Sequence, residues 1–490
     1  MIDVEALAVR YGDVPALSGL DLQIPGGQFV LVTGPSGCGK STLVRALTGL
    51  IPHALPATMT GRVTVNGLNT REQPLSTLAR HAAIVLQNPA AQLFHLNVAD
   101  EVAFGPRNLG LPEQEVQERA AWALAAVGID DLRARRPSTL SGGEQQRVAI
   151  AAVLAMQPTI LILDEPTASL DSQGTDKVLA TLKRLNRQLD MTVVLVEHRL
   201  AAAMSLAHRL LILDEGVLVA DGAPQDLLQN RNLREAFGLR RPGTPSSTSW
   251  ETLLTSNGAP SGDSPLLLQM EGVTAGYRGN PVLHDVNLSL RRGEFVAVVG
   301  ENGAGKSTLG RVAAGLLKPA GGEVRFQGNR RPRPGRDVAL LFQNPADQIF
   351  TDSVGEEVAF GPRNYRVFDE AFHRQILAQA DLQCLCKRCP THLSVGQQQR
   401  TVLAACLAMQ PRLLILDEPT LGQDWAHLQR LMDFVQRLNQ SGTTILLISH
   451  DYKLVYRYAD RVLLLREGRI TLDGHPVPQP ATHRTRERES

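Results

Sequence analysis

A glycine-rich pattern suited to holding phosphate occurs twice in the chain. Both copies fit G-x-x-x-x-G-K-[ST], and each follows a short apolar run. The glycines let successive backbone N–H groups turn inward around phosphate oxygens, while the lysine reaches the outer phosphates and the serine hydroxyl binds Mg²⁺. The phosphate-binding candidates are Gly34, Pro35, Ser36, Gly37, Cys38, Gly39, Lys40, Ser41 and Thr42, and in the second copy Gly300, Glu301, Asn302, Gly303, Ala304, Gly305, Lys306, Ser307 and Thr308.

A pair of adjacent acidic residues follows a later apolar run in each half. The pairs are Asp164 with Glu165, and Asp417 with Glu418. A buried strand places its final carboxylates at the carboxyl edge of a parallel sheet, beside the phosphate loop. There the first carboxylate suits Mg²⁺ through water, and the second is placed to polarise an attacking water. A strand that merely happens to end in two acids is the alternative, and its recurrence behind both loops disfavours it.

The elements that must position these groups are strands and helices in alternation. β-Branched apolar runs alternate with helical stretches such as 113–127, which predicts an α/β fold with a mostly parallel sheet. The pattern repeats along the chain, which predicts one domain over residues 1–239 and a second over 266–476. Residues 240–265 are rich in Pro, Ser, Thr and Gly and are predicted to be a flexible tether, and residues 477–490 a disordered tail.

Composition excludes several classes of function. The 490 residues allow two or three domains, and 50 basic against 49 acidic residues give no electrostatic argument for a nucleic-acid partner. No apolar run approaches the roughly 18–20 residues that span a bilayer, and the N-terminus does not resemble a signal peptide, so we expect a cytoplasmic chain. Cys384, Cys386 and Cys389 precede His392, but the spacing is not a standard zinc pattern, so ordinary surface and core thiols are favoured over a metal site.

A further pattern carries a family resemblance. L-S-G-G-E-Q-Q-R and L-S-V-G-Q-Q-Q-R stand just before the two acidic strands. With these signatures the chain resembles the ATP-binding cassette (ABC) ATPases in two copies. The resemblance implies two P-loop NTPase domains, each with a mostly parallel core sheet, an antiparallel β subdomain and a helical signature subdomain. A signature offers N–H groups, a serine hydroxyl and a helix dipole to a γ-phosphate held by the opposite copy. The signature candidates are Ser141, Gly142, Gly143, Glu144, Ser394, Gly396 and Gln397.

The other positions of the family are also filled. The resemblance implies adenine stacking for Tyr11 and Tyr277, for which strand packing is the alternative. It implies Mg²⁺ and γ-phosphate sensing by Gln87 and Gln343, γ-phosphate contact by His198 and His450, and a contact between the copies by Asp171 and Asp424. The implied catalytic groups are Glu165, Glu418, His198, His450, Gln87 and Gln343, and the implied Mg²⁺ ligands are Ser41, Gln87, Asp164, Ser307, Gln343 and Asp417.

Two ATP molecules would then be sandwiched between the fused copies. The first site joins the loop of Lys40 to the signature of Ser394, and the second joins the loop of Lys306 to the signature of Ser141. Both sites keep lysine, glutamate and histidine, so we expect both to hydrolyse ATP. Val395 in the signature and the 421–424 loop depart from the family pattern, and both departures fall on the first site, so we expect the first site to be slower.

A narrower resemblance comes from the segments after the two glutamines. Q-N-P-x-x-Q-[LI]-F and E-V-A-F-G-P-R-N recur in both halves, as in the energy-coupling factor (ECF) branch, which imports vitamins, their precursors, nickel or cobalt. In that branch the segment docks coupling helices of a membrane subunit. Apolar Leu93, Phe94 and Phe104 suit such a helix, although Phe104 and Phe360 could instead be core. Asp100, Glu101, Glu356 and Glu357 are predicted to attract arginine on the partner.

The predicted partners are a transmembrane energy-coupling subunit and a small substrate-binding membrane subunit, with the chain peripheral on the cytoplasmic face of the membrane. The fusion and the insertion at 49–53 resemble importers of thiamine and its pyrimidine precursor, which leaves the cargo open. One alternative is a soluble tandem cassette acting on ribosomes or DNA, disfavoured by the short neutral tether. The other is an exporter subunit, disfavoured by the docking pattern.

Overall fold

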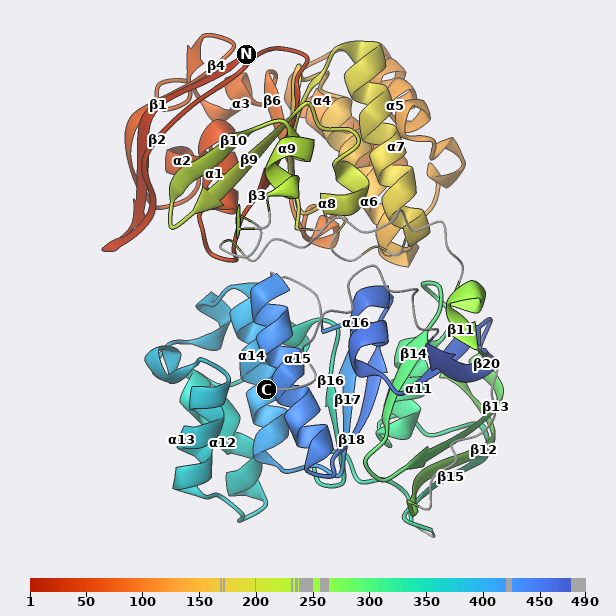
Figure 1. Cartoon of the computed structure of the whole chain (residues 1–490). Coiled ribbons are helices and arrows are strands. Elements are labelled where there is room, and N and C mark those ends of the chain that lie inside the picture. Colours follow the sequence, from red (N-terminus) through yellow and green to blue (C-terminus); the bar gives the residue numbers. More distant parts are fainter. Residues whose placement is uncertain are drawn as a thin grey trace. The chain divides into compact units, whose positions relative to one another are not determined.

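The chain folds into two compact units, the first made by residues 1–246 and the second largely by residues 247–490, which we call unit 1 and unit 2. The computed structural model describes residues 1–167, 170, 172–198, 200–230, 232–233, 237, 250–255, 264–328, 330–419 and 425–476. Figure 1 colours unit 1 from red to yellow-green and unit 2 from green to blue. Both units contain a mostly parallel sheet, so the predicted α/β fold class is confirmed.

The core sheet of unit 1 runs in the order β10-β9-β3-β8-β7-β6. β3 pairs in parallel with β8 and β9, β7 pairs in parallel with β8 and β6, and β10 adds an antiparallel edge. All residues of β3, β7 and β8 are buried, as their unbroken apolar runs predict. The bounds are β3 Phe29–Thr33, β6 Ala82–Val85, β7 Ile160–Asp164, β8 Thr192–Val196, β9 Arg209–Asp214 and β10 Val217–Gly222.

Two layers cover the core sheet of unit 1. One face packs with α1 against an antiparallel sheet of order β2-β1-β4-β5, and the other packs against helices α4 to α7 (Figure 1). The phosphate loop and the signature therefore approach the sheet from different layers. The bounds are β1 Ile2–Tyr11, β2 Val14–Ile24, β4 Thr58–Val65, β5 Leu68–Asn69, α1 Lys40–Leu47, α2 Leu50–His53, α3 Leu75–Leu78, α4 Val98–Asn108, α5 Glu113–Val127, α6 Gly142–Leu154, α7 Ser172–Leu189, α8 Leu200–Ala203 and α9 Pro224–Gln229.

Unit 2 repeats this plan. Its core sheet has the order β11-β20-β19-β14-β18-β17-β16, and its antiparallel sheet has the order β13-β12-β15. The bounds are β11 Leu254–Thr255, β12 Leu266–Tyr277, β13 Asn280–Arg291, β14 Phe295–Val299, α11 Lys306–Ala313, β15 Gly321–Phe326, β16 Val338–Leu341, α12 Val354–Asn364, α13 Glu370–Gln379, α14 Val395–Ala408, β17 Leu413–Asp417, α15 Trp425–Gln440, β18 Thr444–Ile448, α16 Tyr452–Tyr458, β19 Arg461–Arg466 and β20 Arg469–Pro476.

Part of the predicted tether is anchored. The turn Trp250–Leu253 and the short strand β11 lie within 240–265, and β11 pairs with β20 at the edge of the unit 2 core sheet. The ring of Trp250 lies 5.9 Å from that of Tyr452, and Glu251 forms an ion pair with Arg466. The description of 240–265 as a uniformly flexible tether does not hold for residues 250–255, because an aromatic contact and two strand residues fix them.

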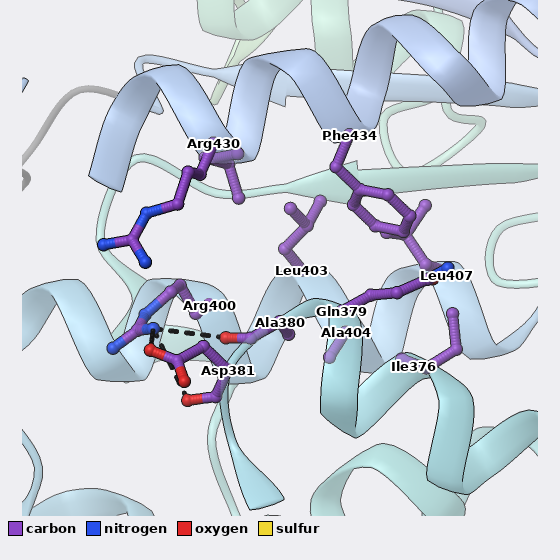
Figure 2. A pocket seen from close by; sticks show the side chains of 11 residues that line it. Ile376, Gln379, Ala380, Asp381, Arg400, Leu403, Ala404, Leu407, Arg430 and Phe434 are labelled. Atoms are coloured by element: carbon purple, nitrogen blue, oxygen red, sulfur yellow. Dashed lines mark hydrogen bonds and ion pairs between the residues drawn. The ribbon is translucent and has the colours of Figure 1, made fainter. Parts of the chain in front are cut away.

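Helices α13, α14 and α15 leave a small cavity where they meet in unit 2. Its volume is about 50 Å³, and Leu403 and Phe434 line it from two of the three helices (Figure 2). At one end Arg400 donates to the carbonyl of Ala380 and to the carboxylate of Asp381 at 2.9 Å. The pocket is lined mainly by apolar side chains, and Arg400 with Asp381 closes one end of it.

Candidate functional site

Each phosphate loop is shaped by glycines that no other residue could replace. Gly34 has φ 146° and Gly300 has φ 151°, a region that favours glycine. A Cβ atom at Gly34 would lie 2.0 Å from the carbonyl oxygen of Leu213, and one at Gly300 would lie 2.2 Å from that of Leu465. The loop therefore lies directly against the end of the neighbouring strand, so that it opens at the carboxyl edge of the sheet.

The two loop lysines hold the curved loops together. Lys40 Nζ donates to the carbonyl oxygens of Gly34 and Pro35 at 2.9 and 2.8 Å, and Lys306 Nζ donates to those of Gly300 and Glu301 at 2.9 Å each. Both lysines are buried and begin helices α1 and α11. The dipole and free N–H groups of a helix start add to the ammonium charge. Each loop therefore concentrates positive potential where phosphate would bind.

Asp164 and Asp417 end β7 and β17 and are both buried. Burial raises the pKa of both carboxyls, that of Asp417 to about 6, while hydrogen bonds from Ser41 and Ser307 oppose the rise. In the described part of the chain the Oδ1 atom of each aspartate is buried and has no hydrogen-bond partner.

The chemistry of these donors fits Mg²⁺. A serine hydroxyl and an aspartate come together in each unit, and hard oxygen donors are the ligands that Mg²⁺ prefers. A buried carboxylate oxygen without a partner is costly unless a cation or water satisfies it. The residues present are therefore compatible with the predicted magnesium sites.

Glu165 is held between two polar side chains in unit 1. Gln87 Nε2 donates to Glu165 Oε2 at 2.9 Å, and His198 Nε2 lies 3.0 Å from Glu165 Oε1. Glu165 has φ 48°, which is unusual for a residue with a side chain, and its N–H donates to the carbonyl of Val196. The left-handed turn lets the backbone continue the sheet while the carboxylate faces the predicted reaction centre. Three of the predicted catalytic side chains therefore meet in unit 1.

Unit 2 forms a less complete cluster. His450 Nδ1 lies 2.9 Å from Glu418 Oε1, and Glu418 has φ 50° like its counterpart. Gln343, in contrast, is exposed, and among the described residues its side chain makes no contact with Glu418. The two units thus differ in the glutamine position, although their sequences at these positions are the same.

The predicted adenine-stacking tyrosines both lie beside their phosphate-loop helix. The hydroxyl of Tyr11 lies 3.5 Å from that of Thr42 in α1. Tyr277 is 41% exposed, and Arg311 of α11 donates to its hydroxyl at 2.8 Å. Thr308 is buried next to the loop lysine, as Thr42 is. An exposed aromatic ring beside the loop is inconsistent with strand packing alone for Tyr277.

The signatures form the N-termini of α6 and α14. In each, a serine caps the helix and a residue three positions later bonds back to the cap, Ser141 with Glu144 and Ser394 with Gln397. The hydrogen bond from Ser141 lowers the pKa of Glu144. The capping boxes fix the orientation of the predicted phosphate-binding N–H groups. Asp171 and Asp424, predicted to contact the opposite copy, lie outside the described residues, as do the 421–424 loop and the side chain of Val395.

The structure adds a buried glutamate that the motifs do not indicate. Glu197 precedes His198, accepts a hydrogen bond from Thr167, and accepts another from the N–H of His198 at 3.0 Å. Ser449 occupies the equivalent place before His450. Its position beside a predicted catalytic histidine was the available signal in the sequence. Through this bond Glu197 can orient the backbone that carries the histidine.

The Q-N-P-x-x-Q segments are folded by their second glutamine. Gln92 accepts from the N–H of Leu86 at 2.8 Å and donates to the carbonyl of Ile84. Gln348 accepts from Phe342 and donates to Leu340 at 2.7 and 2.9 Å. In each unit, one glutamine amide thus takes the place of a neighbouring strand at the end of β6 or of β16. The segment after it is thereby turned away from the sheet.

Two of the four acidic residues of this segment do not serve as predicted. Glu101 and Glu357 are buried, and each accepts backbone N–H groups of the preceding loop, at 2.8 Å in unit 1 and at 3.0 and 3.2 Å in unit 2. The prediction that they face an arginine on a partner is therefore wrong, because both carboxylates are buried and accept hydrogen bonds from the loop. Asp100 is half-buried and Glu356 is exposed, and they pair with Arg107 and Arg363 within their own helices.

The aromatic residues of the segment are exposed. Phe94 and Phe350 are 65% and 64% exposed, and Phe104 and Phe360 are 38% and 44% exposed. In each unit the two rings meet edge to face, with centroids 5.0 and 4.6 Å apart. The core alternative for Phe104 and Phe360 is thus excluded. An exposed aromatic pair formed by a loop and the helix that follows it is typical of a protein-binding surface.

Two other expectations concern what the chain lacks. Within the described ranges, no helix combines the length and the apolar character needed to cross a membrane. The same ranges hold no group of three or more His, Cys, Asp or Glu side chains arranged to bind a metal, and this includes the cysteines before His392.

Comparison with known proteins agrees with this geometry. A family model described as ABC transporter matches residues 17–168 and again 283–421, which together make more than half of the chain. The chain belongs to the ABC transporter family. It is an ABC-type ATPase with two fused cassettes, and it binds and hydrolyses ATP. Both matches contain a phosphate loop and an acidic strand, so each cassette has its own nucleotide-binding machinery.

Two relatives match over almost the whole of this chain. A provisionally named ABC transporter ATP-binding protein of Methanosarcina acetivorans is 39% identical over 514 residues, covering 95% of this chain and 84% of the relative. A Bacillus subtilis protein, provisionally named HMP/thiamine import ATP-binding protein YkoD, is 34% identical and covers 97% and 92%. The archaeal recycling factor aABCE1, solved with a ribosomal stalk protein, covers 96% of this chain with a TM-score of 0.61 at 20% identity, which supports the fold alone.

Proposed function

We propose that this chain is the energy-coupling ATPase of an ECF-type importer, bound to the cytoplasmic face of the membrane through separate membrane subunits. The observation that carries the proposal is the docking segment, built the same way in both units. In each, a glutamine turns the loop out of the sheet, a buried glutamate ties it to the next helix, and an exposed aromatic pair remains. Duplication of this surface fits a membrane subunit that presents two coupling helices.

The cargo class we propose is a vitamin or vitamin precursor, with thiamine and its hydroxymethylpyrimidine precursor as the first candidates. Similarity to the B. subtilis protein over nearly the whole of both chains supports this choice. In such a system a small membrane subunit binds the cargo and a transmembrane coupling subunit receives the stroke, so the ATPase itself needs no cargo site. The alternative of a protein that acts on ribosomes is supported only by a likeness in fold.

The nucleotide chemistry follows from the clusters in each unit. Lys40 and Lys306 neutralise the outer phosphates, and Tyr11 and Tyr277 contact the adenine. Mg²⁺, held by Ser41, Asp164 and Gln87 or by their counterparts Ser307, Asp417 and Gln343, would add positive charge at the transferring phosphate. Glu165 and Glu418 each accept a proton from the attacking water, while His198 and His450 orient the glutamates.

We further propose that each signature completes the site of the other cassette, with Asp171 and Asp424 contacting across. Closing on two ATP molecules and reopening after hydrolysis would then be the stroke delivered to the membrane subunit. The departures at Val395 and in the 421–424 loop both affect the site of Lys40, which should turn over more slowly.

Turnover by Glu165→Gln, Glu418→Gln and the double variant tests the catalytic assignment. We expect the double variant to lose on the order of a hundredfold or more, because removing a general base typically costs 10²–10⁴. Glu418→Gln should lose more than Glu165→Gln, since its site is the faster one. Glu467→Gln is the matched control, because Glu467 also has a left-handed backbone, φ 44°, but lies outside the site. Wild-type turnover in the double variant would refute the assignment.

Co-purification with membrane subunits tests the ECF assignment. The double variant Phe94→Ser and Phe104→Ser, and its unit 2 counterpart at Phe350 and Phe360, should no longer co-purify with the membrane subunits from detergent-solubilised membranes, where no bilayer remains for the chain to bind. Leu189→Ser removes an equally exposed apolar side chain elsewhere and should change nothing. Sedimentation of the wild-type chain with ribosomes instead of membranes would favour the ribosome alternative.

A further inference from the structure

Unit 2 carries a basic loop that unit 1 lacks. The connection from β15 to β16 contains Arg330, Arg331, Arg333 and Arg336 within seven positions. The matching connection in unit 1 has only Arg71 and Arg80, with Glu72 beside them. Because unit 1 forms the same sheets without this concentration of charge, the fold does not require it.

The loop is held rigid by one buried acid. Asp337 accepts from Arg330 at 2.7 and 3.0 Å and from Arg333 at 3.0 Å, and its N–H donates to the carbonyl of Arg333 at 2.9 Å. These two arginines therefore keep their charges internally paired. The arrangement fixes the loop backbone and leaves Arg331 and Arg336, which flank Arg333, exposed.

The charges that remain available come from three neighbouring segments, since a Cβ at Gly315, close to Lys318 in the chain, would lie 2.5 Å from the carbonyl oxygen of Pro332 in the basic loop. Arg331, Arg336, Arg366 and Lys318 are all exposed, and within the described residues no hydrogen bond or ion pair engages their side chains. The acid that influences Arg331, Glu323, is already bonded to Arg325 at 2.7 Å. These four cations outnumber the two exposed acids that follow Phe368, Asp369 and Glu370, of which Glu370 lies 3.9 Å from Arg374, so the surface has a net positive charge.

Apolar side chains lie next to this charge. The α12 helix ends at Asn364, and Tyr365, Val367 and Phe368 follow it with exposures of 47%, 61% and 37%. The hydroxyl of Tyr365 is 3.9 Å from the position that a Cβ of Gly335 would take, so this segment abuts the basic loop. The unit 1 helix α4 is instead followed by Leu109-Gly110-Leu111-Pro112, without aromatic or basic residues.

We propose that this surface, formed by Arg331, Arg336, Arg366, Lys318, Val367 and Phe368, binds directly to the anionic surface of a lipid bilayer. Polybasic segments gain roughly 1 kcal/mol per Lys or Arg near acidic headgroups, and interfacial apolar side chains supply the second signal that stable attachment needs. The proposal concerns contact with lipid itself and does not depend on the transport function or on any membrane subunit.

The same side chains argue against a nucleic-acid partner. Val367, the most exposed of the apolar group, can enter the headgroup region of a membrane but cannot stack on a base. The chain as a whole carries a net charge of only +1, whereas nucleic-acid binding normally comes with a strong basic excess. A lipid surface uses both the charge and the aliphatic side chain.

Flotation of the purified full-length chain with protein-free vesicles tests the proposal. We expect binding to vesicles that contain phosphatidylglycerol and little binding to pure phosphatidylcholine, with the difference reduced by salt. The double variant Arg331→Gln with Arg336→Gln should weaken binding by about thirtyfold, the equivalent of about 1 kcal/mol per charge. Lys183→Gln with Arg187→Gln removes two exposed charges from α7 of unit 1 and should leave binding unchanged.

Two further arms separate the alternatives. Val367→Ser with Phe368→Ser should weaken vesicle binding several-fold at constant charge, whereas no effect would mean that only the charges act and would overturn the membrane proposal. Competition with a single-stranded RNA oligonucleotide should leave the chain on the vesicles. If RNA displaces it, or if both double-charge variants lose binding equally, the proposed surface is wrong. Unchanged thermal unfolding verifies that each variant is folded.

Discussion

The buried glutamate under the docking loop of unit 2 allows a quantitative prediction. Glu357 Oε2 accepts three hydrogen bonds, from the N–H of Phe350 at 3.2 Å and from the N–H and hydroxyl of Thr351 at 3.0 and 2.8 Å. Hydrogen bonds to a charged group contribute about 1.5–3 kcal/mol, and neutral ones about 1 kcal/mol. Glu357→Gln keeps an acceptor of the same shape but removes the charge from all three bonds.

We expect Glu357→Gln to destabilise the loop by about 2 kcal/mol, because roughly 3 kcal/mol of charge assistance is lost and part is regained when no buried charge needs desolvation. Glu357→Ala should cost about 4 kcal/mol, since the two N–H groups then lose their acceptor altogether, whereas the Thr351 hydroxyl keeps the carbonyl of Ser353 at 3.1 Å. A chain of two domains does not unfold in one step, so a global melting temperature would not isolate this effect.

Hydrogen exchange of the Phe350 and Thr351 amides is the suitable measurement, because it reports the local opening free energy. The glutamine variant should accelerate their exchange by about thirtyfold, and the alanine variant by considerably more. Glu356→Gln is the matched control, since its side chain is 57% exposed and pairs only with Arg363. Equal exchange in Glu357→Ala and Glu356→Gln would refute the reasoning that the buried carboxylate holds the loop.

Two other predictions concern stability. Burial opposes the ionisation of Asp337, but the hydrogen bonds from Arg333 and Arg330 outweigh burial and lower the pKa of the carboxyl below the ordinary value of 3.8. The ionised Asp337 therefore stabilises the fold above pH 3.8, and this stabilisation is lost as pH falls through the lowered pKa. Protection of the residue 337 amide against hydrogen exchange, which reports local opening, should therefore differ between wild type and Asp337→Asn at pH 7 and converge as pH falls below about 4. A constant difference down to acid pH would contradict the assignment. Ser394→Ala removes a helix cap and should cost about 1 kcal/mol in unit 2, measured by exchange of the Gln397 amide, whose acceptor it removes at 3.3 Å. Ser18→Ala, at an exposed position of strand β2, is the control outside a cap.

The sequence predicted the parts of the site that depend on chain order. The phosphate loops, the acidic strand ends and the signature caps all follow from motifs whose residues are close together in the chain, and a parallel sheet brings strand ends to one edge. Glu165 and His198 meet for this reason. The sequence also predicts the contact between Gln87 and Glu165. It does not predict that the described residues of unit 2 lack the equivalent hydrogen bond, because Gln343 occupies the same position there.

The direction in which a side chain points was the main source of error. Glu101 and Asp100 are adjacent acids at the start of a helix, and only the folded loop decides that Glu101 turns inward to accept N–H groups. Composition misled in a similar way at 250–255, where a single tryptophan and two strand residues anchor a segment that is otherwise rich in small and polar residues. Such contacts join distant parts of the chain and leave no periodic pattern.

The bonds made by the two loop lysines have a consequence for the thermodynamics of nucleotide binding. Lys40 and Lys306 each hold two carbonyl oxygens of their own loop, so the cradle is already curved and little conformational entropy is lost when a ligand enters. The ammonium group must, however, exchange carbonyl partners for phosphate oxygens. The affinity of the loop for a nucleotide therefore depends on how much more strongly the ammonium group binds a charged phosphate oxygen than a carbonyl dipole. The loops should for this reason discriminate nucleotides by the ionisation state of their terminal phosphate.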